Sequence, residues 1–299
     1  MKLSQVIGNT WVVEGQELIP LYKLEGDRCI LLDTGLASER EELEEALLTA
    51  GLTPAGVLCS HAHVDHCANN GYFQQKYGTL SALTAPEAGM CCNRLTLKCY
   101  FLTLTPDMAE ESGGSMLHTP DVIIPARDGL FSFCGAQFRI IYTPGHSAGH
   151  ISAITPDNVC YAADALLSHE LLGAKLPYNL SQREAIASRE KLRGLGCDAY
   201  IMAHRGVCTG AEIDELIDGN QELIRLRTEE ILELVVRPMT LSQIDQAVCE
   251  RYQLFTHKPP RSLRFERNVR FFTEYLVDEG RLELTCRRGV AYYSRSVTP

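Results

Sequence analysis

Residues 60–66 read Ser-His-Ala-His-Val-Asp-His and directly follow the apolar run 55–59, Ala-Gly-Val-Leu-Cys. The apolar run predicts a buried strand. His61 and His63 are two residues apart, so on an extended segment both rings point to the same side and could chelate one metal ion. Asp65 and His66 come after a turn and could face a second ion. Imidazole and carboxylate groups together suit zinc and its neighbours.

Three further candidate ligands stand at the ends of later predicted strands. They are His146 in Thr-Pro-Gly-His, Asp164 in Tyr-Ala-Ala-Asp and His204 in Ile-Met-Ala-His. Such spacing arises when successive strands of a sheet deliver side chains to one edge. Residues 61–66 contain four potential metal ligands. This number fits a structural metal site poorly, because such a site needs four ligands in total and closes around its ion.

The remaining pattern predicts an α/β protein of two parts. Strand-like runs alternate with turns over the first 35 residues, and strands and helices then alternate as far as residue 210. After Gly210 the pattern becomes mostly helical. We predict a first domain over 1–210 and a second over 211–299. The second has the predicted order of three helices and a β-hairpin that turns at Arg288-Gly289, and it resembles a winged helix.

Composition narrows the protein class. The chain has 299 residues and a formal net charge of −10. No apolar run approaches the roughly 20 residues of a membrane span, and the N-terminus lacks the apolar core of a signal peptide. The twelve cysteines are scattered without a CxxC pair, which fits a reducing compartment. We therefore expect a cytoplasmic protein without a membrane partner.

The histidine and aspartate pattern, with Leu31-Leu32-Asp33-Thr34-Gly35 upstream, resembles the metallo-β-lactamase superfamily over about residues 5 to 208. Its pattern is HxHxDH, a Gly-His, an Asp and a last His, all found here in that order. The resemblance implies an αββα sandwich, here followed by the winged-helix-like C-terminal domain. It also implies two divalent metal ions; zinc is expected first, with iron and manganese as alternatives.

The resemblance assigns a role to each candidate residue. One ion would be held by three histidines, the second by three other side chains, and one carboxylate would bridge both: His61, His63 and His146; Asp65, His66 and His204; and Asp164. The metal pair would acidify a bridging water and give a hydroxide nucleophile. Asp65 would also orient this hydroxide and help to protonate the leaving group. Asp33 would hold the ligand loop by hydrogen bonds.

Two departures from the family pattern occur beside the ligands. The family usually has a glycine before the bridging Asp, where this chain has Ala163, and Gly-His-Gly at the last ligand, where it has Ala203-His204-Arg205. Arg205 either meets a substrate anion or forms a surface ion pair. His118 either touches substrate or is merely exposed. The segment 89–104 is either a helix that covers the cleft or ordinary core.

The ligand set with a bridging Asp resembles that of the hydroxyacylglutathione thioesterases (glyoxalase II) and of phosphodiesterases such as ribonuclease Z. Our leading hypothesis is a dinuclear hydrolase acting on a small ester or thioester, because an acidic first domain repels polyanions. The tail argues against a strict glyoxalase II assignment, since that family carries a different helical end.

Two alternatives rest on the C-terminal region. Residues 251–299 hold ten Lys/Arg against five Asp/Glu, a net of +5. A phosphodiesterase or endoribonuclease could bind single-stranded RNA through a stripe of four arginines spaced by three: Arg261, Arg264, Arg267 and Arg270. The same arginines could instead pair with the acidic first domain. A non-enzymatic role, docking or homodimerisation, could use the apolar face that includes Phe265, Phe271, Phe272, Tyr275 and Leu276.

Overall fold

The computed structural model describes residues 1–296. Its first sheet has seven strands in sequential order. The first four pair antiparallel as the predicted meander, and the remaining neighbours pair in parallel. The strands are β1 (Lys2–Ile7), β2 (Thr10–Glu14), β3 (Leu18–Lys23), β4 (Arg28–Leu32), β5 (Thr53–Leu58), β6 (Leu80–Thr84) and β7 (Val122–Ile124).

The second sheet has six strands in the order β13-β12-β11-β10-β9-β8. All neighbours pair antiparallel except β11 and β12, which are parallel. The strands are β8 (Gly129–Phe133), β9 (Ala136–Tyr142), β10 (Ile151–Ile154), β11 (Val159–Ala163), β12 (Ala199–Met202) and β13 (Gly206–Thr209).

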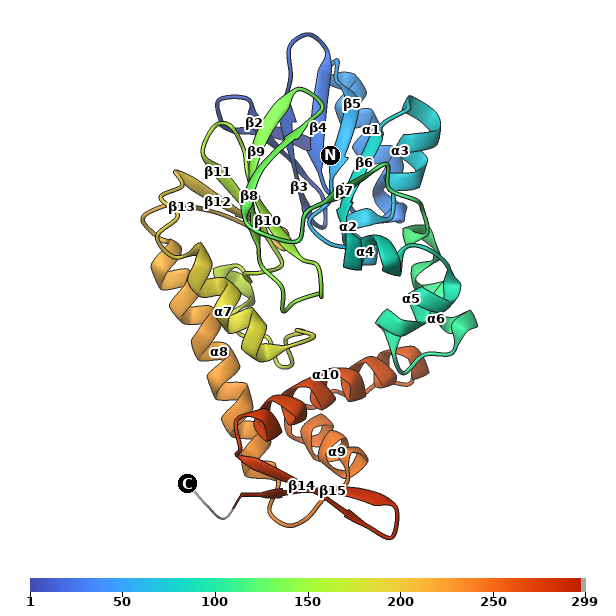
Figure 1. Ribbon diagram of the computed structural model, residues 1–299, viewed down its shortest axis with the longest axis vertical. Helices are drawn as coiled ribbons and strands as arrows, with labels where there is room; N and C mark the ends of the chain where they lie inside the picture. Colours follow the sequence, from blue (N-terminus) through green and yellow to red (C-terminus); the bar gives the residue numbers. More distant parts are fainter. Residues whose placement is uncertain (297–299) are drawn as a thin grey trace.

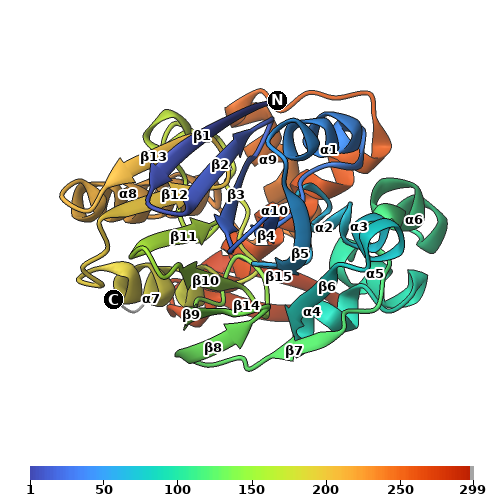
Figure 2. The same cartoon turned by 90° about the horizontal axis from the view of Figure 1, so that it is seen from above.

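Helices cover the outer faces of both sheets, as Figures 1 and 2 show. The helices of the first layer come before β8 in the sequence, whereas α7 covers the second sheet. They are α1 (Arg40–Thr49), α2 (Val64–Cys67), α3 (Asn70–Tyr77), α4 (Ala85–Met90), α5 (Arg94–Phe101), α6 (Pro106–Gly113) and α7 (Gln182–Leu192). The predicted αββα sandwich is therefore confirmed.

Alternation along the central strands explains why both faces are covered. On β4, Leu31 packs into the core under the first helices, whereas Ile30 and Leu32 face the space between the sheets. On β11, Tyr161 faces the other sheet and Cys160 faces the second helical layer. Because successive side chains of a strand point to opposite faces, a strand that is apolar throughout requires cover on both sides.

The C-terminal part follows in the predicted order of three helices and a hairpin. These are α8 (Ile213–Leu234), α9 (Leu241–Tyr252), α10 (Pro259–Asp278), β14 (Leu282–Arg287) and β15 (Val290–Arg295). Thr240 caps α9 through a capping box with Gln243. The hairpin turns at Arg288 and Gly289, which both have positive φ, as a type I′ hairpin turn requires. The predicted second domain ends at 299, and residues 297–299 lie outside the described residues.

The helix α8 belongs to two hydrophobic cores. Ile213 and Leu216 pack on the second sheet, whereas Ile224 and Ile231 pack with α9, α10 and the hairpin. The helix α10 runs beneath the sandwich (Figure 1) and contacts α7 and α8. The helix α8 therefore begins just after the predicted boundary at residue 210 and contributes side chains to both cores.

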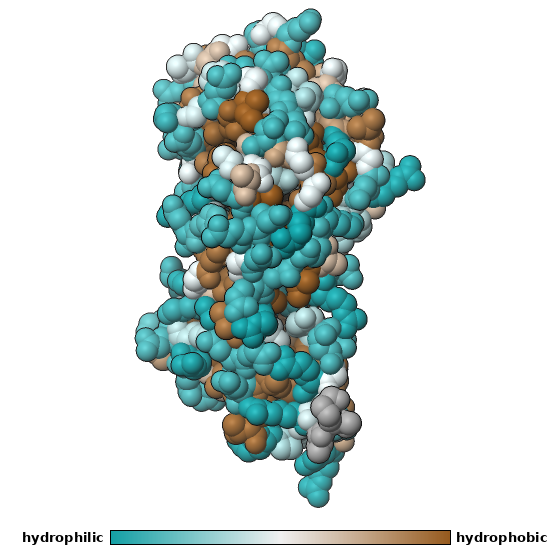
Figure 3. Space-filling model, turned by 90° about the vertical axis from the view of Figure 1, so that its left-hand side faces the viewer, coloured by the Kyte–Doolittle hydropathy of each residue, from teal (hydrophilic) through white to brown (hydrophobic). Residues whose placement is uncertain are grey.

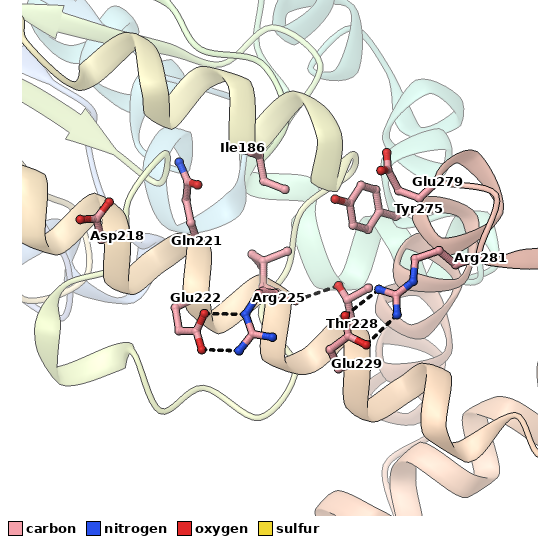
Figure 4. Close-up of a pocket in the computed structure, with 11 residues that line it drawn as sticks. Ile186, Asp218, Gln221, Glu222, Arg225, Thr228, Glu229, Tyr275, Glu279 and Arg281 are labelled. Atoms are coloured by element: carbon pink, nitrogen blue, oxygen red, sulfur yellow. Dashed lines mark hydrogen bonds and ion pairs between the residues drawn. The ribbon is translucent and has the colours of Figure 1, made fainter. Parts of the chain in front are cut away.

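A groove of about 390 Å³ lies between α7, α8 and α10 (Figure 4). Its charges are paired: Arg225 bonds Glu222 at 2.6–2.7 Å, and Arg281 bonds Glu229 at 2.6–2.7 Å. This groove therefore contributes to the junction between the two parts and presents few free charges.

On the face shown in Figure 3, hydrophilic side chains predominate and hydrophobic ones form separate patches. Within residues 1–296, no helix combines the length and the apolar character needed to span a membrane.

Candidate metal centre

The structure brings the seven predicted ligands together at one edge of the sandwich. Potential ligand atoms of His61, His63 and His146 lie within 4.8 Å of one another, and so do those of Asp65, His66 and His204. His61 and His63 follow β5, and α2 carries Asp65 and His66. The other three follow β9, β11 and β12. Each triad contains the three side chains, apart from Asp164, that the family resemblance assigns to one ion.

Asp164 stands between the triads. Its Oδ2 lies 3.3 Å from Nε2 of His146, 3.5 Å from Nε2 of His66 and 3.3 Å from Nε2 of His204. One carboxylate therefore lies close to members of both triads.

Four buried nitrogen and oxygen atoms at this centre have no hydrogen-bond partner among residues 1–296. They are Nε2 of His61, His63 and His66, and Oδ1 of Asp164. An unsatisfied buried polar group costs about 1–3 kcal/mol, so several in one place indicate a ligand that satisfies them together. The donor set of imidazole and carboxylate fits divalent zinc, iron or manganese.

Asp33 sets the orientation of two of these rings. Its carboxylate accepts hydrogen bonds from Nδ1 of His66 (2.8 Å), from the hydroxyl of Tyr161 (2.7 Å) and from the amide and hydroxyl of Ser60 (both 2.6 Å). Because the Ser60 hydroxyl donates to Asp33, its oxygen accepts from Nδ1 of His61, 2.9 Å away. Both rings therefore carry their proton on Nδ1 and leave Nε2 free for a metal. Although Asp33 lies within reach of His61 and His66, its oxygens are already occupied.

Glu87 is a second buried carboxylate, and sequence reasoning missed it. It accepts from the amide of Ala62 (2.7 Å), the hydroxyl of Ser147 (2.7 Å) and the amide of Gly149 (2.6 Å). It therefore ties the loop of His61 and His63 to the loop of His146. Burial raises the pKa of Glu87, and the three donors oppose this rise. Glu87 lies in the short helix α4, and no sequence motif there identifies it as a site residue.

Glu17 pairs with the ring nitrogen of His204 that faces away from Asp164. The sequence pattern did not identify Glu17 as part of the site. Glu17 is buried and pairs with Nδ1 of His204, which leaves Nε2 facing Asp65 and Asp164. An open groove of about 670 Å³ adjoins these residues and is lined by Arg205. Arg205 is exposed and forms no ion pair within the described residues.

The backbone at the centre is strained at three non-glycine residues. Asp33, Ala163 and Arg205 have φ of 70°, 47° and 56°, in the left-handed region that costs roughly 1–2 kcal/mol for residues with a side chain. Ala163 and Arg205 are two of the three positions where the sequence departs from the glycines of the family pattern; the third is Ala203. The first two keep the glycine-like backbone conformation.

The histidines of the centre fall into two groups by the direction of their pKa shifts. Burial lowers the pKa of His61 and His63 well below its usual range and that of His146 to about 4. Burial also disfavours charge on His66 and His204, but Asp164 outweighs it, with help from Asp65 at His66 and from Glu17 at His204. The pKa of His66 is raised, and that of His204 rises to about 10. The first triad is therefore neutral and ready to bind a cation.

Aromatic rings close the centre on one side. The centroid of the Tyr100 ring on α5 lies 4.5 Å from that of the His63 ring. The centroid of the Tyr178 ring lies 5.1 Å from that of the His146 ring. On α5, Leu97 and Phe101 pack into the first core. The predicted segment 89–104 thus serves as core on one face and as cover on the other.

His118 is not brought to the ligands. Its Nδ1 donates to the carbonyl of Met116 at 2.8 Å, and its Nε2 lies 3.3 Å from Asn70 Nδ2 and 3.2 Å from Ser81 Oγ. These contacts place it among α3, β6 and the segment after α6, where its hydrogen bonds are with protein groups.

The four arginines of α10 do not form one exposed stripe. Arg261 and Arg264 are exposed, Arg270 is half-buried, and Arg267 is 5% exposed. Arg267 contacts Tyr100 and Tyr178, and no ion pair to a carboxylate joins any of the four arginines among residues 1–296. The structure therefore bears out neither the continuous phosphate-binding stripe nor the predicted pairing with acidic residues.

The profile of the metallo-beta-lactamase superfamily matches residues 4–204. The chain is 24% identical over 157 residues to the probable metallo-hydrolase YqgX of Bacillus subtilis, covering 50% of this chain and 64% of that protein. It is 26% identical over 200 residues to the hydroxyacylglutathione hydrolase of Brucella ovis, covering 66% of each. The chain thus spans slightly less than two thirds of the length of these curated relatives.

Two solved structures share the fold over nearly the whole chain. The metallo-beta-lactamase family protein TTHA1429 from Thermus thermophilus has a TM-score of 0.70 at 22% identity and covers 93% of both chains. A beta-lactamase domain protein from Burkholderia ambifaria has a TM-score of 0.73 at 16% identity, with 99% of this chain and 94% of that chain covered. At such identities the likeness concerns the fold, including that of the C-terminal helices.

Proposed function

The chain belongs to the metallo-β-lactamase superfamily and is a metal-dependent hydrolase, and we propose that it cleaves a small thioester or ester at a centre of two divalent metal ions. The observation that carries the proposal is the pair of ligand triads joined by Asp164. The choice of a thioester is supported by the similarity to a hydroxyacylglutathione hydrolase.

In this proposal His61, His63 and His146 would hold one ion, Asp65, His66 and His204 would hold the other, and Asp164 would contribute to both sites. Two ions held by these residues would supply Lewis-acid chemistry, that is, polarisation of the acyl oxygen and a lowered pKa of water near pH 7. Asp33 and Ser60 keep the rings of His61 and His66 in the tautomer that ligates. Glu17 does the same for His204.

Asp65 is the residue we assign to proton movement. Its carboxylate lies 3.9 Å from Nε2 of His66 and 3.6 Å from Nε2 of His204, and its side chain is 27% exposed. It is therefore open enough to meet both the attacking water and the leaving group. We propose that it accepts a proton from the former and delivers one to the leaving thiol or alcohol.

The test combines metal content with turnover. Purified protein loaded with zinc or manganese is analysed for bound metal, and acyl thioesters and aryl esters are offered while the released thiol or phenol is measured. We expect about two ions per chain and turnover of thioesters. Asp65→Asn should lower kcat by about 10²-fold or more, whereas the exposed Glu45→Gln should behave as the unaltered protein. Two bound ions without turnover of any probe would overturn the proposal.

A further inference from the structure

Arg267 is a buried cation from the second domain that lies beside the candidate metal centre. It stands on α10 and is 5% exposed. The guanidinium carbon lies 4.4 Å from the centroid of the Tyr178 ring and 5.2 Å from that of Tyr100. Its Nη1 donates a 3.3 Å hydrogen bond to the carbonyl of Tyr100, and its buried Nε has no partner among residues 1–296.

The same two tyrosines connect Arg267 to the histidines. The Tyr100 ring lies 4.5 Å from that of His63, and the Tyr178 ring lies 5.5 Å from it and 5.1 Å from that of His146. Arg267 is therefore separated from the first ligand triad by one layer of side chains. Burial and the neighbouring histidines are the main causes of the lowered pKa of His63, and the charge of Arg267 is a smaller cause. This agrees with the proximity of Arg267 to His63.

A buried cation without an anionic partner is energetically costly. Within the described residues, Arg267 has one long hydrogen bond and two ring faces, and no carboxylate lies within ion-pair distance of it. Stacking on a ring uses the face of the guanidinium and holds it flat, whereas the N–H groups at its edge remain the donors for an oxyanion. A planar guanidinium binds carboxylate or phosphate oxygens in pairs.

We propose that Arg267 is a specificity-determining residue that binds an oxyanion of the substrate, a carboxylate or a phosphate, at a short distance from the scissile bond. The second domain would then select anionic thioesters or esters for a centre built by the first. This inference rests on the proposed function for its substrate type. It does not depend on that function for the anion-binding property itself.

The kinetic test uses two matched pairs of acetyl thioesters. In one pair, S-acetyl-N-acetylcysteamine and S-acetyl-3-mercaptopropionate, a carboxylate replaces a neutral acetamido group; the other pair is S-acetylpantetheine and its 4′-phosphate. We expect the unaltered enzyme to prefer one anionic member. Arg267→Met should lower kcat/KM for that probe by about 10- to 100-fold, mainly through KM, and change the neutral probes by less than about twofold. Arg264→Met, an exposed arginine of the same helix, is the matched control and should change none.

A purely structural role for Arg267 gives a different result. If it only docks α10 on α5, Arg267→Met lowers turnover of neutral and anionic probes alike, and this outcome overturns the proposal. No preference for either anionic probe by the unaltered enzyme also overturns it. If Arg267→Met does not fold, Arg267→Lys retains the charge without the planar fork; it should then lose at least about threefold on the anionic probe only, and an equal loss on both or no loss overturns the proposal.

A binding measurement separates this inference from the proposed function. Titration calorimetry of succinate and of inorganic phosphate is carried out on zinc-loaded protein and on its Arg267→Met and Arg267→Lys forms. If neither a thioester nor an ester is turned over, the proposed function fails. Anion binding that is weakened about tenfold by Arg267→Met, and by a smaller factor by Arg267→Lys, still supports the anion site. Equal binding by all three proteins overturns it.

Discussion

The carboxylate of Asp33 lies 2.8 Å from Nδ1 of His66 and thereby directs Nε2 of that ring toward Asp164, 3.5 Å away. One acidic residue after β4 thus decides which nitrogen of a predicted ligand is available. The same carboxylate reaches His61 through Ser60.

Asp33→Asn should weaken metal binding by about 10- to 100-fold, because the amide no longer offers two acceptor oxygens to the donors around it. Asparagine tolerates the positive φ at this position, so the backbone is retained. Chelator competition measures the zinc affinity. Tyr161→Phe removes one donor to Asp33 and should have a smaller effect; equal zinc affinity of Asp33→Asn and the unaltered protein would contradict this role.

Replacing Arg205 separates backbone strain from side-chain function. Arg205→Gly relieves a φ of 56°, whereas Arg205→Ala removes the same charge and keeps the strain. We expect the glycine variant to be more stable to urea than the alanine variant by about 1 kcal/mol. If both unfold with the same free energy, the positive φ carries no measurable cost here.

Glu87→Ala should lower the free energy of unfolding by about 3 kcal/mol or more, because three donors buried at the centre lose their acceptor. Glu87→Gln retains one acceptor oxygen and should cost less. The exposed Glu45→Ala provides the comparison, with a change of at most about 0.5 kcal/mol. Urea denaturation gives the values, and an Ala variant as stable as the Glu45 control would rule out Glu87 as the tie between the two loops.

Asp245 on α9 should make stability fall as pH rises. Burial and the carboxylate of Glu266 raise its pKa from the ordinary 3.8 to about 6, against the Cys249 thiol. Between about pH 4 and 6 the folded state holds more protons than the unfolded state, so the contribution of Asp245 is full below this window and lost above it. Asp245→Asn should therefore raise Tm at pH 7.5, with a gain that shrinks toward pH 4.5. A gain independent of pH would point to another cause.

Sequence predicted the parts of this molecule that depend on local pattern. The apolar run before His61 and the polar residues that end β9, β11 and β12 predict strands and the edge they share. Thr240 and the Arg288-Gly289 turn predict a helix start and a hairpin because capping and positive φ have local chemical requirements.

The surroundings of the centre were not predictable in this way. Tyr100 and Arg267 meet across 167 positions of sequence, and only the packing of α10 under the sandwich brings them together. Glu17 and Glu87 look like ordinary surface acids in sequence. Their burial follows from the donors that the fold places around them, which no short pattern records.

The continuity of α8 has a consequence for how the chain can be divided. Its 22 residues extend about 33 Å. A chain cut at residue 210 would lose Ile213, Leu216 and Ile217 from the outer face of the second sheet, leaving Tyr200 and Met202 exposed to water. Such a fragment would be prone to aggregate rather than behave as a smaller enzyme, because α8 completes the core on the outer face of the second sheet.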